Sequence, residues 1–154
     1  MNRTEAREIA FMLLYMGTIN SDSAAERVEE FFEEEHYKSL KSLEPGIFKS
    51  PDENNLAYIK ELLLSAYENR DELDERINKY LKNWRSDRLS KTSLALLRLS
   101  MAEILYLGTP VGASINETVE IAKKYEENKE TVALINGVLG SFSKELSAKK
   151  EEEK

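Results

Sequence analysis

Hydrophobic side chains recur at intervals of three and four residues through most of this 154-residue chain. This spacing places them on one face of an α-helix, whereas a half-buried strand requires alternation with a period of two, and no sustained alternation occurs. Glycine and proline, which number 6 and 3, stand at the breaks between the helical stretches. The pattern predicts an all-α fold of about seven helices.

Capping residues mark the helix boundaries of the first half. The first helix is expected to end near Gly17, and Ser23 with Glu26 forms a capping box for the second. The segment 50–53 places a serine cap before a proline at the first helical position of the third. The side chains expected to face inward are Ile9, Leu13 and Met16, then Val28, Phe31 and Phe32, then Leu56, Ile59, Leu63 and Ala66.

The second half contains four further helical stretches. The chain turns near residues 69–73 into one helix, and a long apolar helix follows and stops at 108–110. Residues 114–117 form another capping box, and Asn128 caps the last helix, in which Gly137 and Gly140 are expected to allow close helix packing. The expected inward side chains are Leu73, Ile77, Tyr80, Leu81 and Trp84, then Leu89, Leu97, Met101, Ile104 and Leu105, then Ile115, Val119, Ala122 and Tyr125, then Val132, Ile135, Leu139 and Phe142.

Charge is distributed unevenly along the chain. The net charge is −7, but residues 1–77 carry 9 basic and 18 acidic groups while residues 78–154 carry 13 and 11. The stretch 79–98 holds six basic residues and one acid. The acidic half could attract a basic protein and the basic stretch could meet phosphate, although a solvated surface of uneven charge gives the same pattern.

The residues needed for most kinds of catalysis are missing. Without cysteine the chain forms no disulfide, iron–sulfur cluster or thiolate zinc site, and its one histidine, His36, follows three glutamates. Phosphate-binding loops and metal-binding helix motifs are also absent from the sequence. We therefore expect no enzyme activity and no cofactor. No apolar run approaches the ~20 residues that a membrane span needs, so we expect a soluble cytoplasmic protein.

Four strings in order resemble one family. They are Ala6-Arg7-Glu8-Ile9-Ala10 with Leu14-Tyr15, Trp84-Arg85-Ser86-Asp87-Arg88-Leu89-Ser90 with Leu96-Leu97-Arg98-Leu99 and Ala102-Glu103-Ile104-Leu105, Pro110 with Ile115-Asn116-Glu117-Thr118-Val119-Glu120-Ile121-Ala122-Lys123-Lys124-Tyr125, and Asn136-Gly137-Val138-Leu139. Together they are similar to the bacterial transcription antitermination factor family NusB over roughly residues 3–146.

This resemblance implies both a fold and a function. The fold would be a single NusB-like helical domain over 1–148, with an N-lobe of about 1–68, a C-lobe of about 69–148, each lobe of three-helix type, and a disordered charged tail at 149–154. Family members pair with a ribosomal small-subunit protein (NusE), bind the boxA element of nascent RNA with it, and help RNA polymerase read through terminators in ribosomal RNA operons.

Site residues follow from the resemblance position by position. Arg3 and Arg7 match an arginine-rich N-terminus that binds RNA, and their four-residue spacing puts them on one helical face. Tyr80 matches a tyrosine that could stack on a base, although core packing suits it equally. The resemblance and the basic stretches assign RNA contacts to Arg3, Arg7, Tyr80, Lys82, Lys129 and Asn136, and contacts with the ribosomal protein to Tyr15 and Asp87.

The chain also departs from the family pattern. Thr4 and Glu5 stand where basic residues are usual, Ala133 and Leu134 replace a lysine and a phenylalanine, and Ser93 replaces an acid. An alternative interpretation is therefore a NusB-like protein–protein adaptor whose RNA binding is weakened or lost. An exposed partner-binding face could also pair with itself, which leaves a homodimer open.

Overall fold

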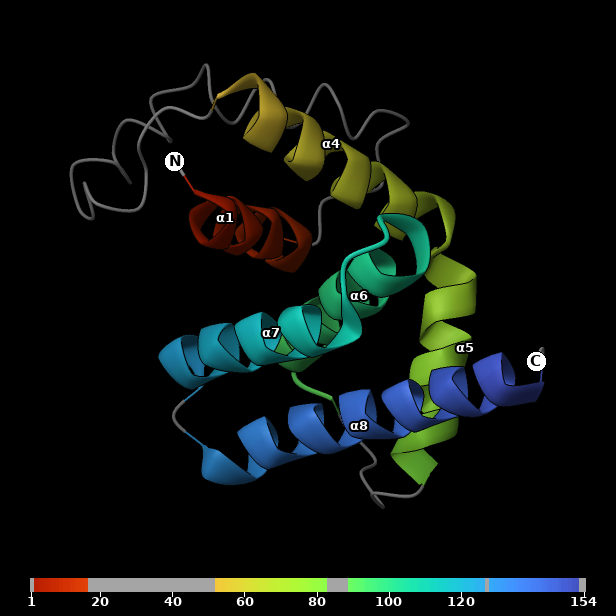
Figure 1. Cartoon of the computed structure of the whole chain (residues 1–154). Helices are drawn as coiled ribbons and strands as arrows, with labels where there is room; N and C mark the ends of the chain where they lie inside the picture. The colour runs from red at the N-terminus through yellow and green to blue at the C-terminus, as the bar shows by residue number, and fades with distance from the viewer. Residues whose placement is uncertain (1, 17–51, 83–88, 127, 153–154) are drawn as a thin grey trace. The chain divides into compact units, whose positions relative to one another are not determined.

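The computed structural model describes residues 2–16, 52–82, 89–126 and 128–152 (Figure 1). Every regular element among them is a helix, which confirms the all-α prediction; the second predicted helix, near 23–32, lies outside the described residues. The chain divides into two compact units, Met1–Glu68 and Asn69–Lys154. The helices are α1 (Arg3–Tyr15), α4 (Glu53–Glu68), α5 (Arg70–Leu81), α6 (Lys91–Tyr106), α7 (Val111–Tyr125) and α8 (Lys129–Glu152).

In the first unit α1 packs along α4. The helix α1 starts at a complete capping box, because the side chain of Asn2 accepts a hydrogen bond from the Glu5 backbone and the Glu5 carboxylate accepts one from the Asn2 backbone. This interaction satisfies two backbone N–H groups at the helix start. Met16, which was expected to face inward, is the C-cap residue and is 37% exposed. The shared core consists of Ala6, Ile9, Ala10, Phe11, Leu13, Leu14, Tyr58, Ile59, Leu62, Leu63 and Ala66.

The start of α4 lies later in the chain than predicted. Asp52 precedes the helix, and its Oδ1 atom accepts a hydrogen bond of 2.7 Å from the backbone N–H of Asn55. Its backbone carbonyl also accepts the first intrahelical bond, from Leu56 at 2.9 Å. Asp52 therefore fills the capping role that we had assigned to Ser50, because an aspartate carboxylate also satisfies the free N–H groups of a first turn. Ser50 and Pro51 themselves lie outside the described residues.

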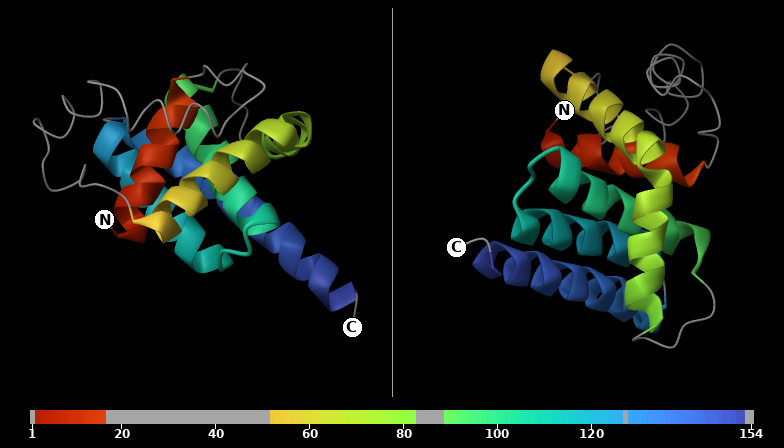
Figure 2. Two further views of the ribbon diagram at one scale, coloured as in Figure 1. Left: turned by 90° about the horizontal axis from the view of Figure 1, so that it is seen from above. Right: turned by 90° about the vertical axis from the view of Figure 1, so that its right-hand side faces the viewer.

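In the second unit α6, α7 and α8 lie side by side, and α5 crosses them (Figure 2). The helix α5 contacts α6 and α8, and α7 contacts both of its neighbours. The predicted inward residues of α5 and α8 form the centre of this core: Leu73, Ile77, Ile135, Leu139 and Phe142 are almost completely buried. The helical periodicity therefore identified these buried residues correctly, whereas Val132, also expected to face inward, is only half-buried. Trp84 lies outside the described residues.

The helix α7 begins three residues before the capping box predicted at 114–117. Gly108, with a φ of 71°, and Pro110 turn the chain after α6, and the Pro110 carbonyl accepts the N–H of Ser114. Ser114 is fully buried, and its hydroxyl shares a hydrogen bond of 2.9 Å with that of Ser100 on α6. The serine is thus a packing residue, since its small size and its bonded hydroxyl suit a close contact between helices. The buried face of α7 is Ser114, Thr118, Ile121 and Ala122, and Tyr125 is exposed.

The helix α8 begins as predicted and continues further than predicted. Asn128 caps it through a hydrogen bond of 2.8 Å from the Glu130 N–H to its side chain. The helix runs to Glu152, so residues 149–152, which were expected to be disordered, are helical and exposed. At Gly140 an added Cβ would meet no atom within 4 Å, so close packing does not explain that glycine. No helix in the described part of the chain is both long and apolar enough to cross a membrane.

Candidate nucleic-acid interface

Arg3 lies at the start of α1 and reaches toward α4. Its Nε atom donates a hydrogen bond of 3.1 Å to Oδ1 of Asn55, and its guanidinium carbon lies 4.1 Å from the ring centroid of Tyr58. Asn55 is buried, and its backbone N–H bonds to Asp52 at the start of α4. Arg3 itself remains exposed at the surface. Arg3 therefore combines a structural contact with accessible charge.

Arg7 lies one turn further along the same face of α1. Its guanidinium carbon is 5.9 Å from the ring centroid of the same Tyr58, and the residue is only 5% exposed. The predicted shared face of Arg3 and Arg7 exists, and it is the face turned toward α4. Burial of an arginine is costly unless its charge is compensated, so this placement indicates a role in holding the two helices together.

Tyr15, the predicted partner contact, lies at the other end of α1. It is 41% exposed, and its ring centroid is 6.1 Å from that of Phe11. The neighbouring Met16 is also exposed, so two apolar side chains reach the surface together. Asp87 lies outside the described residues. Ser93, which replaces the usual acid, is fully buried, and its backbone N–H and hydroxyl both bond to the Ser90 hydroxyl.

Tyr80 on α5 is buried, with its ring centroid 6.1 Å from that of Phe142 on α8. Its hydroxyl donates a hydrogen bond to the carboxylate of Glu145. Burial, followed by this hydrogen bond and the glutamate's negative charge, raises the pKa of Tyr80 to about 12. Of the two roles left open by the sequence, the structure gives the ring the packing one.

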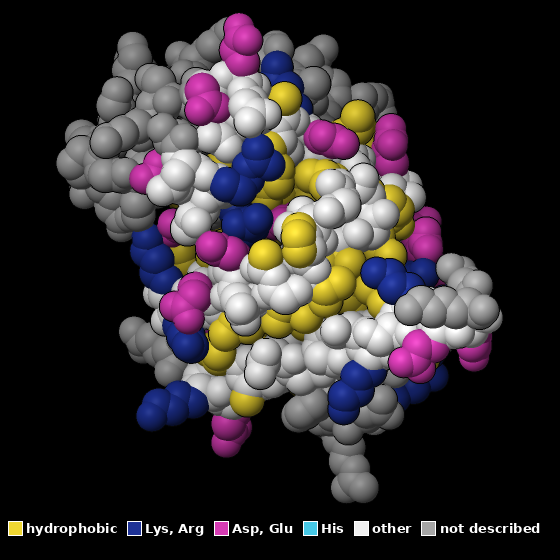
Figure 3. Space-filling view, viewed as in Figure 1, with side chains coloured by type: hydrophobic (Ala, Val, Ile, Leu, Met, Phe, Trp, Pro, Cys, Tyr) yellow, Lys and Arg dark blue, Asp and Glu magenta, His cyan; other side chains and the backbone are white. Residues whose placement is uncertain are grey.

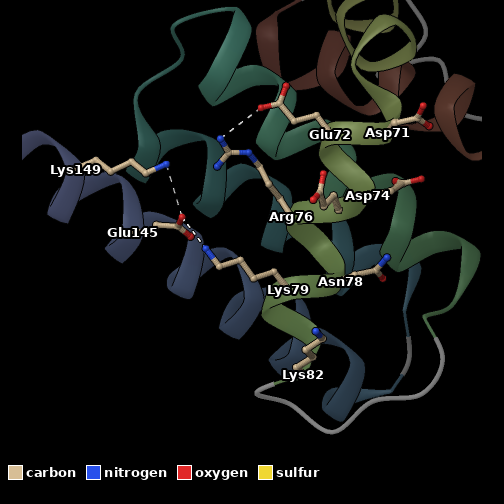
Figure 4. A pocket seen from close by; sticks show the side chains of 10 residues that line it. Asp71, Glu72, Asp74, Arg76, Asn78, Lys79, Lys82, Glu145 and Lys149 are labelled. Atoms are coloured by element: carbon tan, nitrogen blue, oxygen red, sulfur yellow. Dashed lines mark hydrogen bonds and ion pairs between the residues drawn. The ribbon is translucent and has the colours of Figure 1, made fainter.

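A charged depression of about 730 Å³ lies between α5 and α8 (Figure 4). Lys79 and Lys82 line it from the last turn and C-terminal end of α5, and Lys149 lines it from α8. Lys79 approaches the Glu145 carboxylate from α5, and Lys149 approaches it from one turn further along α8, the helix that carries Glu145. The other lining residues are Asp71, Glu72, Asp74, Glu75, Arg76 and Asn78.

One exposed stripe runs along α8. Lys129, Ala133, Asn136, Gly140 and Lys144 follow one another at intervals of three and four residues, which places them on the same face. Lys129, Ala133, Asn136 and Lys144 are exposed, and Gly140 is half-buried with open space above it. We call these five residues the α8 stripe. It has a lysine at each end, an amide in the middle and no bulky side chain between them.

Other residues matched to the family hold the second unit together. Arg98 on α6 donates two hydrogen bonds, of 2.8 and 2.7 Å, to the carboxylate of Asp74 on α5, in the two-pronged geometry that guanidinium and carboxylate groups favour. Glu103 is fully buried, and its backbone carbonyl accepts bonds from Leu107 and Thr109 beyond the end of α6. Asn116 is exposed and Glu117 half-buried.

Positive charge does not form one continuous patch on the visible face of the molecule. In Figure 3 the Lys and Arg side chains are interspersed with Asp and Glu side chains. Among the described residues no group of three or more His, Asp or Glu side chains is placed to hold a metal ion. The sequence did not predict that Glu145 and Lys149 line the charged depression. Their i, i+4 spacing was a signal for their pairing with each other, but not for their contact with α5.

Comparison with known proteins identifies relatives over nearly the whole chain. The NusB family model matches residues 4–144. The transcription antitermination protein NusB of Clostridium perfringens is 40% identical over 147 residues, covering 95% of this chain and 99% of the relative. The protein of the same name from a Thermoanaerobacter species is 39% identical over 142 residues, covering 92% and 90%.

Two solved structures share the fold. T. maritima NusB has a TM-score of 0.65 at 24% identity, covering 94% of this chain and 92% of its own. A chain from the crystal structure of a plectonemic RNA supercoil has a TM-score of 0.67 at 27% identity, covering 95% and 97%. The all-helical fold and these relatives define a class, the bacterial transcription antitermination proteins, which are regulatory factors. The chain belongs to the NusB family.

Proposed function

We propose that this chain is an antitermination factor that binds boxA-type RNA together with a ribosomal small-subunit protein (NusE). The complex would join the RNA polymerase elongation complex in the bacterial cytoplasm and promote read-through in ribosomal RNA operons. The protein itself would act by binding and not by catalysis. Membership of the NusB family supports the general role. The α8 stripe is the observation that carries the RNA-binding part of the proposal.

The α8 stripe has the chemistry that a single RNA strand requires. Lysines such as Lys129 neutralise backbone phosphates, and an amide such as that of Asn136 can donate to and accept from an unpaired base. Because Ala133 and Gly140 have a small side chain or none, little projects from the helix in the middle of the stripe, and an RNA strand can approach the helix backbone closely. Arg3, which is exposed, and Lys82 in the charged depression would add phosphate contacts.

A basic protein partner suits the charge of this chain. The net charge is −7, and the basic side chains on the visible face are interspersed with acids, so the chain alone attracts a polyanion weakly. A ribosomal protein that shares the RNA would supply the missing positive charge. We place its contact at Tyr15, whose exposed ring lies beside exposed Met16, because exposed apolar pairs of this kind suit protein interfaces.

A second candidate function is the adaptor with weakened RNA binding. Two observations favour it. The first is that Arg7 and Tyr80, both expected to touch RNA, are buried. The second is that Ala133 provides no charge at the centre of the α8 stripe, where the resemblance to the family leads us to expect a lysine. In this case the chain would bind the ribosomal protein as firmly as its relatives do but would add little to RNA affinity.

A gel shift with boxA-type RNA separates the two functions. The labelled RNA and a scrambled RNA of equal length are titrated with the full chain, with the partner protein, and with both at moderate salt. Antitermination by RNA binding predicts that both proteins together prefer boxA over the scrambled RNA and bind more tightly than either alone. Equal binding of the two RNAs contradicts it, and formation of the protein pair without any gain in RNA affinity selects the adaptor.

Variants locate the RNA contact within that experiment. Lys129→Ala with Asn136→Ala is expected to weaken boxA binding. It is also expected to lower the magnitude of the salt slope, which is the slope of log affinity against log salt concentration, by about 0.7, the value for one phosphate contact on a single strand. Lys150→Ala is the control, because it removes the same charge from an exposed position of α8 outside the stripe. Equal losses in both variants would show that the stripe has no special part in binding.

A further inference from the structure

The carboxylate of Glu145 has two hydrogen-bond donors from α5 and a lysine of α8 beside it. It accepts a hydrogen bond from the Tyr80 hydroxyl, and its Oε1 atom lies 2.9 Å from Nζ of Lys79 and 3.8 Å from Nζ of Lys149 (Figure 4). The Tyr80 hydrogen bond, and after it the one from Lys79, lower the pKa of Glu145 below its ordinary value of 4.5. The group is therefore an anion at neutral pH, held by hydrogen bonds from Tyr80 and Lys79 and by an ion pair with Lys149.

The charged residues around this carboxylate remain accessible from solvent, whereas Tyr80 is buried. The side chains of Lys79 and Lys149 are 64% and 56% exposed, and that of Glu145 is 25% exposed. The three residues line the depression of about 730 Å³ between α5 and α8, and Lys82 lines it as well. A larger ligand can thus reach both lysines without any change in the packing of the helices.

The acids of the depression are segregated from these lysines along α5. Asp71, Glu72, Asp74 and Glu75 come from the first half of that helix, whereas Lys79 and Lys82 come from its end. Asp71 pairs with Arg70, Glu72 with Arg76 and Asp74 with Arg98, so three of the four acids have a basic partner of their own. At the basic end, the carboxylate facing Lys79 is that of Glu145.

A phosphodiester can replace a carboxylate in such a setting. Each presents one negative charge shared over oxygen atoms, and each accepts charge-assisted hydrogen bonds from lysine. Exposed lysine–carboxylate pairs contribute little net free energy, so exchanging one anion for the other costs little. An internal carboxylate in this position therefore competes with an incoming phosphate for the same lysines.

We propose that Lys79 and Lys149 form a binding site for a backbone phosphate of single-stranded RNA, and that Glu145, whose carboxylate also accepts the hydrogen bond of the Tyr80 hydroxyl, occupies this site until RNA displaces it. The proposal deepens the RNA-binding function above and rests on it. Tyr80, which is buried, contacts Glu145 and is not itself a phosphate ligand. Glu145 lies one residue beyond the segment that matches the family model, so the family match does not assign it.

The test compares two neutralised glutamates on the same helix. Glu145→Gln and Glu152→Gln change the net charge equally, and Glu152 is an exposed residue of α8 near its end. Binding of the full chain with its partner protein to labelled boxA and scrambled single strands is followed by fluorescence anisotropy at several salt concentrations. The Glu145→Gln variant is expected to bind both RNAs about two- to fivefold more tightly than Glu152→Gln, the range that one exposed charge pair gives. Its salt slope is expected to be steeper by about 0.7.

Second-site variants show whether the gain comes from the proposed donors. Lys79→Gln added to Glu145→Gln is expected to remove the gain, and Lys150→Gln, a charge-matched control, is expected to leave it. Circular dichroism of each variant is the control for correct folding. Equal affinities of Glu145→Gln and Glu152→Gln overturn the proposal, and so does a gain that survives Lys79→Gln.

The outcome is separable from that of the antitermination function. If boxA is preferred over the scrambled RNA but the two glutamate variants bind alike, the function stands and the phosphate site is wrong. If neither RNA is preferred and Glu145→Gln still binds both more tightly than Glu152→Gln, the site stands and the sequence-specific function fails.

Discussion

The two groups of residues that the sequence assigns to RNA lie in different surroundings. On α1, Arg7 is buried and Arg3 is bonded to Asn55, with Tyr58 beneath both guanidinium groups. On α8, Lys129 and Asn136 lie exposed on the α8 stripe, which has no bulky side chain between its ends. Both groups have helical spacing, and Arg3, Arg7 and Asn136 match the family pattern. What separates them is the neighbouring helix, because α4 brings an aromatic ring and an amide against the arginines.

The comparison teaches that a matched residue type does not determine a residue's role. A guanidinium group binds phosphate, but it also stacks on tyrosine and bonds to amide oxygens within a fold. The residues of α1 are therefore expected to affect stability first, and those of α8 to affect RNA binding first.

The largest expected effect is on stability, at Arg7. Arg7→Ala removes a buried side chain and its contact with the Tyr58 ring, so we expect a loss of about 2–3 kcal/mol in the free energy of unfolding. Lys129→Ala, on the exposed stripe, is expected to change it by less than about 0.5 kcal/mol. Urea denaturation followed by circular dichroism measures both, and equal values for the two variants would remove the contrast.

A smaller loss is expected at Arg3. Arg3→Ala removes one hydrogen bond and one cation–π contact at an exposed position, so the free energy of unfolding is expected to fall by about 1 kcal/mol. The same variant tests whether Arg3 also binds phosphate, because the salt slope of RNA binding would then decrease by about 0.7. An unchanged slope with lowered stability would make Arg3 purely structural.

On the α8 stripe the expected change has the opposite sign. Gly140→Ala places a Cβ in open space within a helix, which is expected to raise the free energy of unfolding by about 0.5–1 kcal/mol. If RNA lies close to the helix there, the same methyl group weakens RNA binding while it stabilises the protein. A loss of stability would contradict the geometry of the stripe.

The contact between Glu145 and Tyr80 should give the smallest effect, and one that depends on pH. Because the folded state lowers the pKa of Glu145, its contribution to stability is present above the ordinary value of 4.5 and is lost as pH falls through the lowered folded value. The difference in unfolding free energy between wild type and Glu145→Gln is therefore expected to shrink below about pH 4.5. Denaturation series at pH 7 and at pH 3 measure it, and a difference independent of pH would show that the carboxylate charge plays no part.

The pattern of apolar residues predicted most of the fold. The buried faces of α5 and α8, the Asn128 cap and the stop after α6 depend on local chemistry and on helical periodicity, both of which the sequence displays. The capping box at 114–117 was wrong because the same Ser-x-x-Glu pattern occurs inside a helix when the serine fits a close contact, here with Ser100.

The candidate site was less accessible to sequence reasoning. Accessibility of Arg7 depends on Tyr58, which is 51 residues away in the sequence, and the contact between Tyr80 and Glu145 joins residues 65 apart. Such contacts follow from the packing of whole helices and leave no local signal in the sequence. The α8 stripe is different, because its exposure follows from the burial of the opposite face.

Cross-linking tests the central claim, that the exposed stripe of α8 carries the RNA contact, most directly. BoxA-type RNA containing 4-thiouridine is bound to the full chain with its ribosomal protein partner and irradiated, and the linked peptides are mapped by mass spectrometry. The account predicts cross-links within residues 129–144, with their yield reduced by Lys129→Ala with Asn136→Ala and unchanged by Lys150→Ala. Cross-links confined to other parts of the chain, with none in α8, would contradict it.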